Sequence, residues 1–239
     1  MERMFSAFEK RSDKLERIDT GDYTPGEYER FLVEIRLVNR FAGDLRALRR
    51  SLLRRIRGDG LKEFSVLDVG AGSGEVLRTI ARFARRRGLR AQLTALELHE
   101  QSVNVIREAS SEFPEIEAVR GDAFRLPFAD GSFDYAVCSL FTHHFPDDQV
   151  VEILREMSRV SARGIFVIDL HRHPMALILY RLFCFGFRIS PLVVEDGSLS
   201  ILRSFRPREL EILASRAGLE GFSVKRSFPF RNILESQRK

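Results

Sequence analysis

The sequence predicts an α/β fold built on a mostly parallel sheet. From residue 62 onward, short apolar runs rich in β-branched and aromatic residues alternate with stretches of helical periodicity, separated by glycine-containing or polar turns. This alternation is typical of right-handed β-α-β crossovers, which cover both faces of a parallel sheet. The expected strands are FSVLDV, AQLTALEL, IEAVRGD, FDYAVCSL and GIFVIDL, and the helices expected between them cover 75–87, 101–111 and 147–160.

The chain has 239 residues, of which 44% are hydrophobic, so it can bury one large core with attached elements. We predict an N-terminal helical extension or cap over residues 1–60 and a sheet domain over residues 61–239. The extension is expected because apolar residues recur every three or four positions between residues 25 and 56, as on an amphipathic helix. Eight arginines between residues 36 and 57 occupy its other face, which we interpret as a solvated surface.

Composition favours a cytoplasmic protein. The only cysteines, Cys138 and Cys184, lie in apolar runs, which predicts neither a disulfide framework nor a metal cluster. The first 30 residues carry many acids and no unbroken apolar core, unlike a secretory signal. The net charge of +5 would attract nucleic acid, anionic lipid or an acidic substrate alike, so it does not choose among them.

The most apolar part of the chain is PMALILYRLFCFGFRISPLVV, from Pro174 to Val194. Arg181, Gly186 and Arg188 interrupt it, so we expect no transmembrane segment, although peripheral contact with a membrane stays open. Two interpretations remain: a core helix, or an insert at about 174–200 that acts as a lid over a lipophilic substrate. The chain then continues with an expected helix, FRPRELEILASRAGL, and two strand-like runs, GFSVKRS and PFRNIL.

A glycine-rich turn follows the first expected strand. In VLDVGAGSGEVL (66–77), Gly70, Gly72 and Gly74 stand at alternate positions directly after an apolar run. Without Cβ atoms, such a loop can turn sharply and bring its backbone against a ligand. Because ligands of parallel sheets bind outside the carboxyl ends of the strands, this loop is the expected place for a nucleotide-like group.

The acids around this loop help to choose the ligand. A dinucleotide fingerprint starting at Gly70 needs a glycine where Glu75 stands, and no Gly-Lys-Ser/Thr follows for a phosphate-binding loop. With Asp68 before the loop and Glu75 after it, the turn suits a ligand with positive groups. S-adenosylmethionine, with its sulfonium and its amino group, is such a ligand.

Two further strand ends carry side chains suited to an adenosine ligand. Glu97, at the end of the second expected strand, can accept hydrogen bonds from both ribose hydroxyls, a role that dinucleotide enzymes share. After the third strand, Asp122 can accept from an adenine amino group, while Ala123 leaves room for the ring. Leu98 is expected to pack against the adenine face.

Four stretches together resemble the successive motifs of class I S-adenosylmethionine-dependent methyltransferases, in the same order and at similar intervals. They are VLDVGAGSGEVL, TALELHE, GDAFRLPFADGSFDYAVCSL and SFRPRELEILASRAGL, which span about residues 62 to 230. The sequence is most similar to the small-molecule branch that includes quinone-biosynthesis and polyketide-tailoring enzymes. The resemblance implies a Rossmann-like sheet whose last strand is antiparallel, with S-adenosylmethionine as the cofactor.

The resemblance also assigns roles to residues. Asp68 and the loop around Gly70 would hold the methionine end of the cofactor, Glu97 the ribose hydroxyls, and Asp122 with Ala123 the adenine. Ser139 and Leu140, at the end of the fourth strand, would line the methyl-donor pocket. The loop residues included in this site are Gly70, Ala71, Gly72 and Gly74.

Histidines follow the fourth and fifth expected strands. FTHHF places His143 and His144 beside the expected methyl position, and the unperturbed pKa of histidine suits a general base at neutral pH. Adjacent residues of an extended segment point apart, so we expect one of the two to face the pocket. The alternative is that both pack or cap the next helix. His171 and His173 are the second candidates, and we expect no metal site because no third ligand stands nearby.

We therefore predict a methyltransferase that acts on oxygen, or alternatively carbon, of a hydrophobic small molecule such as a phenol, quinone or polyketide. The expected apolar walls are the N-terminal helix and the segment after Pro174. One alternative is an NAD(P)-dependent oxidoreductase, which Glu75 disfavours. Another is an RNA methyltransferase or nucleic-acid-binding module, which we do not expect because SLFTHHF is not the Asn/Asp-Pro-Pro-aromatic type of motif expected after the fourth strand for amino-group methylation of bases.

Overall fold

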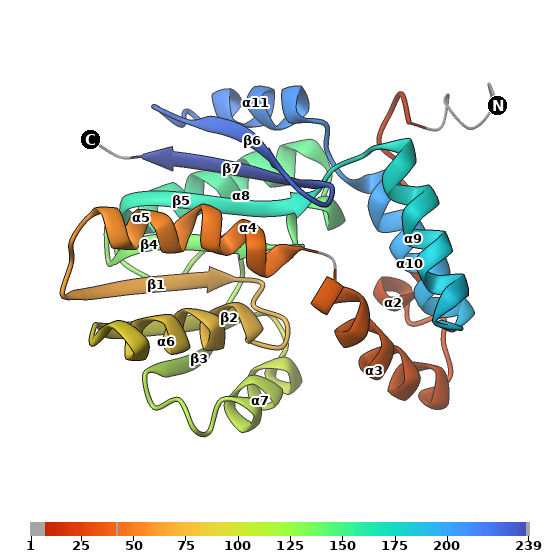
Figure 1. Cartoon of the computed structure of the whole chain (residues 1–239). Helices are drawn as coiled ribbons and strands as arrows, with labels where there is room; N and C mark the ends of the chain where they lie inside the picture. The colour runs from red at the N-terminus through yellow and green to blue at the C-terminus, as the bar shows by residue number, and fades with distance from the viewer. Residues whose placement is uncertain (1–7, 42, 238–239) are drawn as a thin grey trace.

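The fold is organised around one seven-stranded sheet with the strand order β3-β2-β1-β4-β5-β7-β6 (Figure 1). A computed structural model describes residues 8–41 and 43–237 of the chain. The expected strands are all present, with ends that differ by a few residues from those read from the sequence. Their bounds are β1 Glu63–Val69, β2 Arg90–Glu97, β3 Ile116–Arg120, β4 Phe133–Ser139, β5 Ser161–Leu170, β6 Ser223–Ser227 and β7 Arg231–Gln237.

The first five strands pair in parallel, and the last strand runs antiparallel to both of its neighbours. β1 lies inside the sheet, between β2 and β4, and the strand order reverses between β1 and β4. β7 pairs antiparallel with β5, from Gly164 opposite Gln237 to Leu170 opposite Arg231. The predicted Rossmann-like sheet with an antiparallel last strand is therefore confirmed.

Helices cover both faces of the sheet, as the alternating pattern predicts. One face packs against α4, α5, α6 and α7 around a buried cluster that includes Leu52, Ile80 and Ile106. The other face packs against α8 and α11 around a second cluster that includes Leu154 and Leu213. The bounds are α4 Asp44–Arg50, α5 Leu52–Gly58, α6 Glu75–Arg87, α7 Glu100–Ala109, α8 Asp147–Val160 and α11 Pro207–Arg216.

The apolar stripe between residues 25 and 56 is divided among separate helices. α3 (Pro25–Phe41) ends before Gly43, whose φ of +90° is a left-handed conformation that favours glycine. A Cβ at Gly43 would also overlap the ring of Pro229. α4 and α5 then pack on the sheet, whereas α3 packs on helix α10, Pro191–Arg203. The sequence pattern does not reveal this bend, because helical periodicity shows which face of a helix is buried but not which element buries it.

The division into residues 1–60 and 61–239 stays a prediction. Residues 1–7, 42, 238 and 239 fall within those ranges but lie outside the described part of the chain. In the part that is described, α4 and α5 belong to the layer that covers the sheet, so residues 44–58 share their core with the sheet domain.

A further group of helices lies beyond the carboxyl ends of the parallel strands (Figure 1). The apolar segment after Pro174 forms two helices, because Arg188 has a positive φ and Pro191 occupies the first turn of the second helix. Every helix within residues 8–41 and 43–237 is too short or too polar to cross a bilayer. The group consists of α2 Arg17–Thr20, α3, α9 Pro174–Gly186 and α10 Pro191–Arg203.

Candidate functional site

The glycine loop lies between the end of β1 and the start of α6. Gly70, Gly72 and Gly74 all have positive φ, between 57° and 75°. The backbone N–H groups of Gly70 and Ala71 donate to the carbonyl of Leu96, which ties the loop to the end of β2. A Cβ at Gly70 would overlap the ring of Phe141, so this position needs a glycine for space as well as for conformation.

Asp68 is the most unusual group beside this loop. Its side chain is 1% exposed, and neither carboxylate oxygen has a hydrogen-bond partner among the described residues. Burial, together with the nearby charge of Glu97, raises the pKa of Asp68 to about 8. A buried carboxylate without a partner is costly, and a bound cationic or N–H donor group would satisfy it.

Glu97 reaches the same loop from the end of β2. Its Oε1 accepts a hydrogen bond of 2.5 Å from the backbone N–H of Gly72. Burial raises the pKa of Glu97, although hydrogen bonds from the backbone of Gly72 and Leu98 oppose that shift. The carboxylate is thus fixed against the loop, at the strand end where a ribose is expected.

The candidate adenine residues lie at the neighbouring strand end. The N–H of Gly121 donates to the carbonyl of Glu97, which places the residues after β3 next to the end of β2. Asp122 is exposed, and its Oδ1 accepts from the backbone N–H of Phe124 at 2.9 Å, which leaves Oδ2 available. Ala123 is buried and Leu98 is 54% exposed, so Leu98 offers an uncovered apolar side chain.

The end of β4 joins this loop to a large cavity. Ser139 is the last residue of β4. Leu140 follows it with a φ of 53°, a left-handed conformation that is uncommon for leucine, and it lines the cavity. The next residue, Phe141, contacts Gly70. The glycine loop and the cavity are therefore neighbouring parts of one site.

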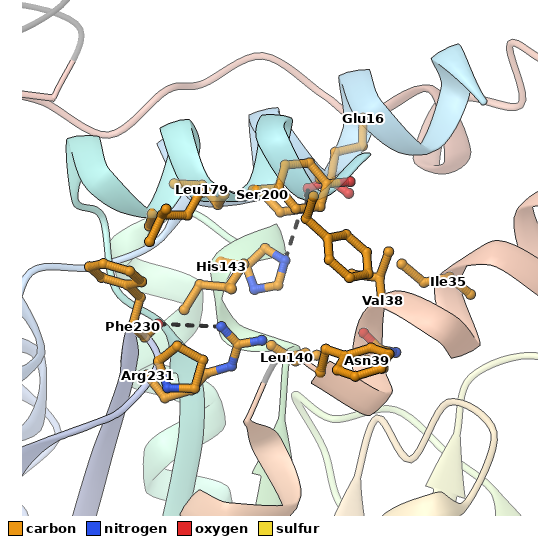
Figure 2. Close-up of a pocket in the computed structure, with 18 of the residues that line it drawn as sticks. Glu16, Ile35, Val38, Asn39, Leu140, His143, Leu179, Ser200, Phe230 and Arg231 are labelled. Atoms are coloured by element: carbon orange, nitrogen blue, oxygen red, sulfur yellow. Dashed lines mark hydrogen bonds and ion pairs between the residues drawn. The ribbon is translucent and has the colours of Figure 1, made fainter. Parts of the chain in front are cut away.

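The cavity has a volume of about 410 Å³ and lies between the strand ends and the outer helices (Figure 2). Its walls are mainly apolar side chains from α3, α9 and α10. Polar groups enter it at a few places, chiefly Glu16, His143, His144 and Ser200. Among the apolar lining residues are Ile35, Val38, Leu140, Ala176, Leu179, Phe183, Ile201 and Phe230.

His143 is held by a buried acid at the end of β5. Its Nδ1 lies 2.7 Å from Oδ1 of Asp169, and its backbone N–H and the hydroxyl of Thr142 both bond Oδ2. Burial raises the pKa of Asp169, but the charge and hydrogen bond of His143 outweigh it and hold the pKa at about 2. In the neutral ring, a hydrogen bond from Nδ1–H to an ionised Asp169 leaves the lone pair on Nε2.

Nε2 of His143 faces the cavity. Its nearest carboxylate is that of Glu16, whose Oε1 is 4.0 Å away (Figure 2), too far for a hydrogen bond. Glu16 is itself buried, and its Oε1 accepts from the hydroxyl of Ser200 at 2.8 Å. An imidazole with an acid behind it and a free nitrogen in an apolar cavity can accept a proton.

His144 has a different environment. Its Nδ1 lies 3.2 Å from Oδ2 of Asp19 and 4.0 Å from Oε1 of Glu16. Burial lowers the pKa of His144, but the hydrogen bond to Asp19 and the charge of Glu16 outweigh that effect, so the pKa is raised. A histidine with a raised pKa is more often charged at neutral pH, which makes His144 the poorer proton acceptor of the pair.

His171 and His173 do not face this cavity. Both line a second cavity, of about 560 Å³, on the other side of the start of α9. Burial, followed by the charges of His173, Arg226 and other bases, lowers the pKa of His171 to about 4. The structure thus brings both His143 and His144 into the main cavity and separates the second pair of candidates from it. The expectation that only one of the two would face the pocket is wrong, because Thr142–His144 form a 3-10 helix and not an extended segment.

Sequence reasoning did not identify Asp169, Glu16 or Asp19. Asp169 carried a usable signal, because it is an acid inside the apolar run GIFVIDL, as Asp68 is inside FSVLDV. Glu16 and Asp19 carried none, since they lie far from His143 and His144 in the sequence and approach these two histidines through the packing of α2 on α10.

Residues 66–164 match the family described as "Methyltransferase domain". This stretch contains the glycine loop, Glu97, Asp122 and both histidines of the main cavity. A curated relative, demethylmenaquinone methyltransferase of Staphylococcus aureus (strain MRSA252), is 32% identical over 120 residues, or 50% of this chain. Over residues 66–164 the chain is therefore similar to a methyltransferase domain, as the resemblance to class I S-adenosylmethionine-dependent methyltransferases predicts. This similarity supports the predicted enzyme class and, with it, the predicted cofactor.

Solved methyltransferase structures share the fold. Magnesium protoporphyrin IX methyltransferase from Synechocystis PCC 6803, with bound SAH, superposes with a TM-score of 0.63 and 15% identity, covering 94% of this chain and 100% of that protein. A SAM-dependent methyltransferase from Aquifex aeolicus gives a TM-score of 0.54 at 17% identity, over 78% and 89% of the two chains. The match to the Staphylococcus relative covers 48% of that protein, about half its length.

Proposed function

We propose that this protein is an S-adenosylmethionine-dependent methyltransferase that methylates oxygen, or alternatively carbon, of a hydrophobic small molecule. The observation that carries the proposal is the free Nε2 of His143, which faces an apolar cavity next to the glycine loop and is backed by the buried Asp169. The name of the Staphylococcus relative, a demethylmenaquinone methyltransferase, supports a quinone-like acceptor. A phenol, a quinol or a polyketide of similar size fits the apolar walls.

The cofactor residues are proposed from their fit. Asp68, buried with no hydrogen-bond partner among residues 8–41 and 43–237, would hold the amino group of S-adenosylmethionine, and Glu97 would bond the ribose. Asp122, Ala123 and Leu98 would surround the adenine. Bound there, the cofactor supplies a methyl group already activated by a sulfonium. This chain then has to position the acceptor, exclude water and remove one proton.

His143 would act as the general base that removes this proton from the acceptor. Nε2 accepts it from an acceptor hydroxyl, while Asp169 stabilises the imidazolium that forms. Removing the proton from a phenol raises the electron density on its oxygen and on its ortho carbons, so the same base serves either methylation site. The ionic pair of His143 and Asp169 transfers the proton to solvent after the product leaves.

We also propose that the insert at about 174–200 acts as a lid. α9 and α10 contribute Ala176, Phe183 and Ile201 to the cavity, and α3 closes the opposite side. Placing this apolar wall over the acceptor would keep water away from the reacting groups. Within the predicted cap of residues 1–60, residues 16–41 would complete the enclosure, because α4 and α5 cover the sheet instead.

The proposal is tested by a methyl-transfer assay. Purified protein and labelled S-adenosylmethionine are combined with a panel of phenols, quinols and alkylpyrones, and product mass spectra locate the new methyl group on oxygen or carbon. Thermal stabilisation by S-adenosylhomocysteine but not by NADH is expected, because a ligand that binds the native state raises its apparent stability. Methylation of RNA instead of every small acceptor would contradict the proposal.

Replacing Glu97 by alanine is expected to weaken binding of S-adenosylhomocysteine about tenfold or more, because a charge-assisted hydrogen bond to a hydroxyl is lost. Calorimetric titration measures this. Glu117→Ala, on the neighbouring strand β3, serves as the matched control and should bind like the unaltered protein. Unchanged affinity of the Glu97→Ala protein would show that the ribose lies elsewhere.

Removing metal ions is expected to leave methyl transfer unchanged. Glu16, His143 and His144 place ligand atoms within 4.8 Å of one another, but Nδ1 of His144 already pairs with Asp19 and Oε1 of Glu16 already accepts from Ser200. The expected absence of a metal requirement is checked by dialysis against EDTA followed by the transfer assay. Loss of activity that Zn²⁺ or Mg²⁺ restores would contradict it.

A further inference from the structure

The outward face of α9 is apolar. Met175, Leu179, Leu182 and Phe185 recur every three or four residues, and their exposed fractions rise from 44% and 47% to 60% and 85% along the helix. The opposite side packs Ala176, Leu177 and Cys184 into the protein. A helix that is apolar all round is normally buried on all sides, so this exposed stripe requires an explanation.

The exposed stripe is continuous with the acceptor cavity. Leu179 lines the cavity and is 47% exposed to solvent. Phe41 of α3 also lines the cavity and is 56% exposed. The ring of Phe41 lies 6.2 Å from that of Phe187, which is 54% exposed at the end of α9. We define the α9 face as these exposed side chains: Phe41, Met175, Leu179, Leu182, Phe185 and Phe187.

Arginines flank the α9 face. Arg181 and Arg188 are exposed within it, and Arg206 and Arg226 line the second cavity beside Met175 at its other end. Arg181 donates to the hydroxyl of Ser198 and Arg206 to the carbonyl of Phe8. Within the described part of the chain, none of these four arginines forms an ion pair, so their charges are not neutralised by the protein itself.

We propose that the α9 face docks on an anionic lipid bilayer, with its apolar side chains inserted among the acyl chains and its arginines on the lipid phosphates. α9 has 13 residues, which is too short to cross a bilayer and suited to lying in the interface. The pairing of exposed apolar side chains with unneutralised arginines matches such a surface. A second copy of this chain would instead bring like charges together.

Docking this way would place the acceptor cavity against the membrane. The inference rests on the proposed function, because a hydrophobic acceptor dissolves in the acyl region and would pass along Leu179 and Phe41 into the cavity. The charged cofactor would enter from the glycine loop, on the side of the cavity away from α9. The two substrates would then reach the reacting position from different solvents.

Sedimentation with vesicles tests the docking surface. The unaltered protein is expected to pellet with vesicles of phosphatidylcholine and phosphatidylglycerol about tenfold more tightly than with phosphatidylcholine alone, and added salt should weaken that preference. The double variant Leu182→Asp/Phe185→Asp should lose about tenfold or more of the binding. Neither residue lines the cavity. Ile212→Asp, on α11 and 53% exposed, is the matched control and should bind like the unaltered protein.

Two results would overturn the docking surface. One is that the unaltered protein stays in the supernatant with anionic vesicles; the other is that the double variant pellets as well as the Ile212→Asp protein. A dimer that Phe185→Asp dissociates, seen by light scattering without vesicle binding, would identify a second copy as the occupant. Stabilisation by S-adenosylhomocysteine is measured on every variant, so loss of folding, failure of methyl transfer and failure of docking are told apart.

Discussion

Replacing His143 by alanine is expected to lower kcat for methyl transfer by about 100-fold to 10,000-fold, the range that a positioned general base contributes. His143 is the histidine whose Nδ1 is held by a buried acid and whose Nε2 faces the cavity. Affinity for S-adenosylhomocysteine should change by less than about twofold, because the glycine loop and Glu97 are untouched. Single-turnover transfer rates and calorimetric titration measure the two quantities separately.

Two variants accompany this experiment. Asp169→Asn keeps the shape of the acid but removes its charge, so it should lower kcat while leaving KM nearly unchanged, because the imidazolium that forms at His143 loses its counter-charge. His171→Ala is the matched control, since His171 lines the other cavity. If the His143→Ala protein keeps its full rate while the His144→Ala protein loses it, the base has been assigned to the wrong histidine.

The fold could be predicted because its signals are local. β-branched runs, glycine turns and helical periodicity each depend on neighbouring residues, and the structure has strands at every run they marked. The clustering of the proposed cofactor residues was predictable for the same reason: Asp68, Glu97 and Asp122 stand at successive strand ends, and parallel strands bring those ends to one edge of the sheet.

The cavity proposed for the acceptor was predictable only in part. FTHHF marked both histidines, but the choice between them depends on Asp169 and Asp19, which approach from other elements. Glu16 enters the cavity because α2 packs on α10, a contact between segments about 180 residues apart that no periodicity reports. The break at Gly43 has a similar origin, since Pro229 fills the space that a side chain would need.

Replacing Asp68 by asparagine is expected to have opposite effects on folding and on cofactor binding. With a folded-state pKa of about 8 against an ordinary value of 3.8, Asp68 is protonated at neutral pH when the protein is folded and ionised when it is unfolded. Its contribution to stability is therefore full below pH 4 and is lost as the pH rises through 8. Asp68→Asn removes this loss, so at pH 8 the free protein should gain about 1 to 3 kcal/mol.

Cofactor binding should respond in the other direction. The amino group of S-adenosylhomocysteine binds the ionised carboxylate, so its affinity for the unaltered protein should rise as the pH increases from 6 to about 8. The Asp68→Asn protein should bind about 10-fold to 100-fold more weakly at pH 8 and lose this part of the pH dependence.

Calorimetry in buffers of different ionisation enthalpy measures the proton that binding releases. Equal proton release by both proteins would place the cationic end of the ligand away from Asp68. A buried carboxylate with no hydrogen-bond partner in the described part of the chain thus lowers the stability of the free protein at pH 8 and supplies a charge that the proposed ligand would neutralise.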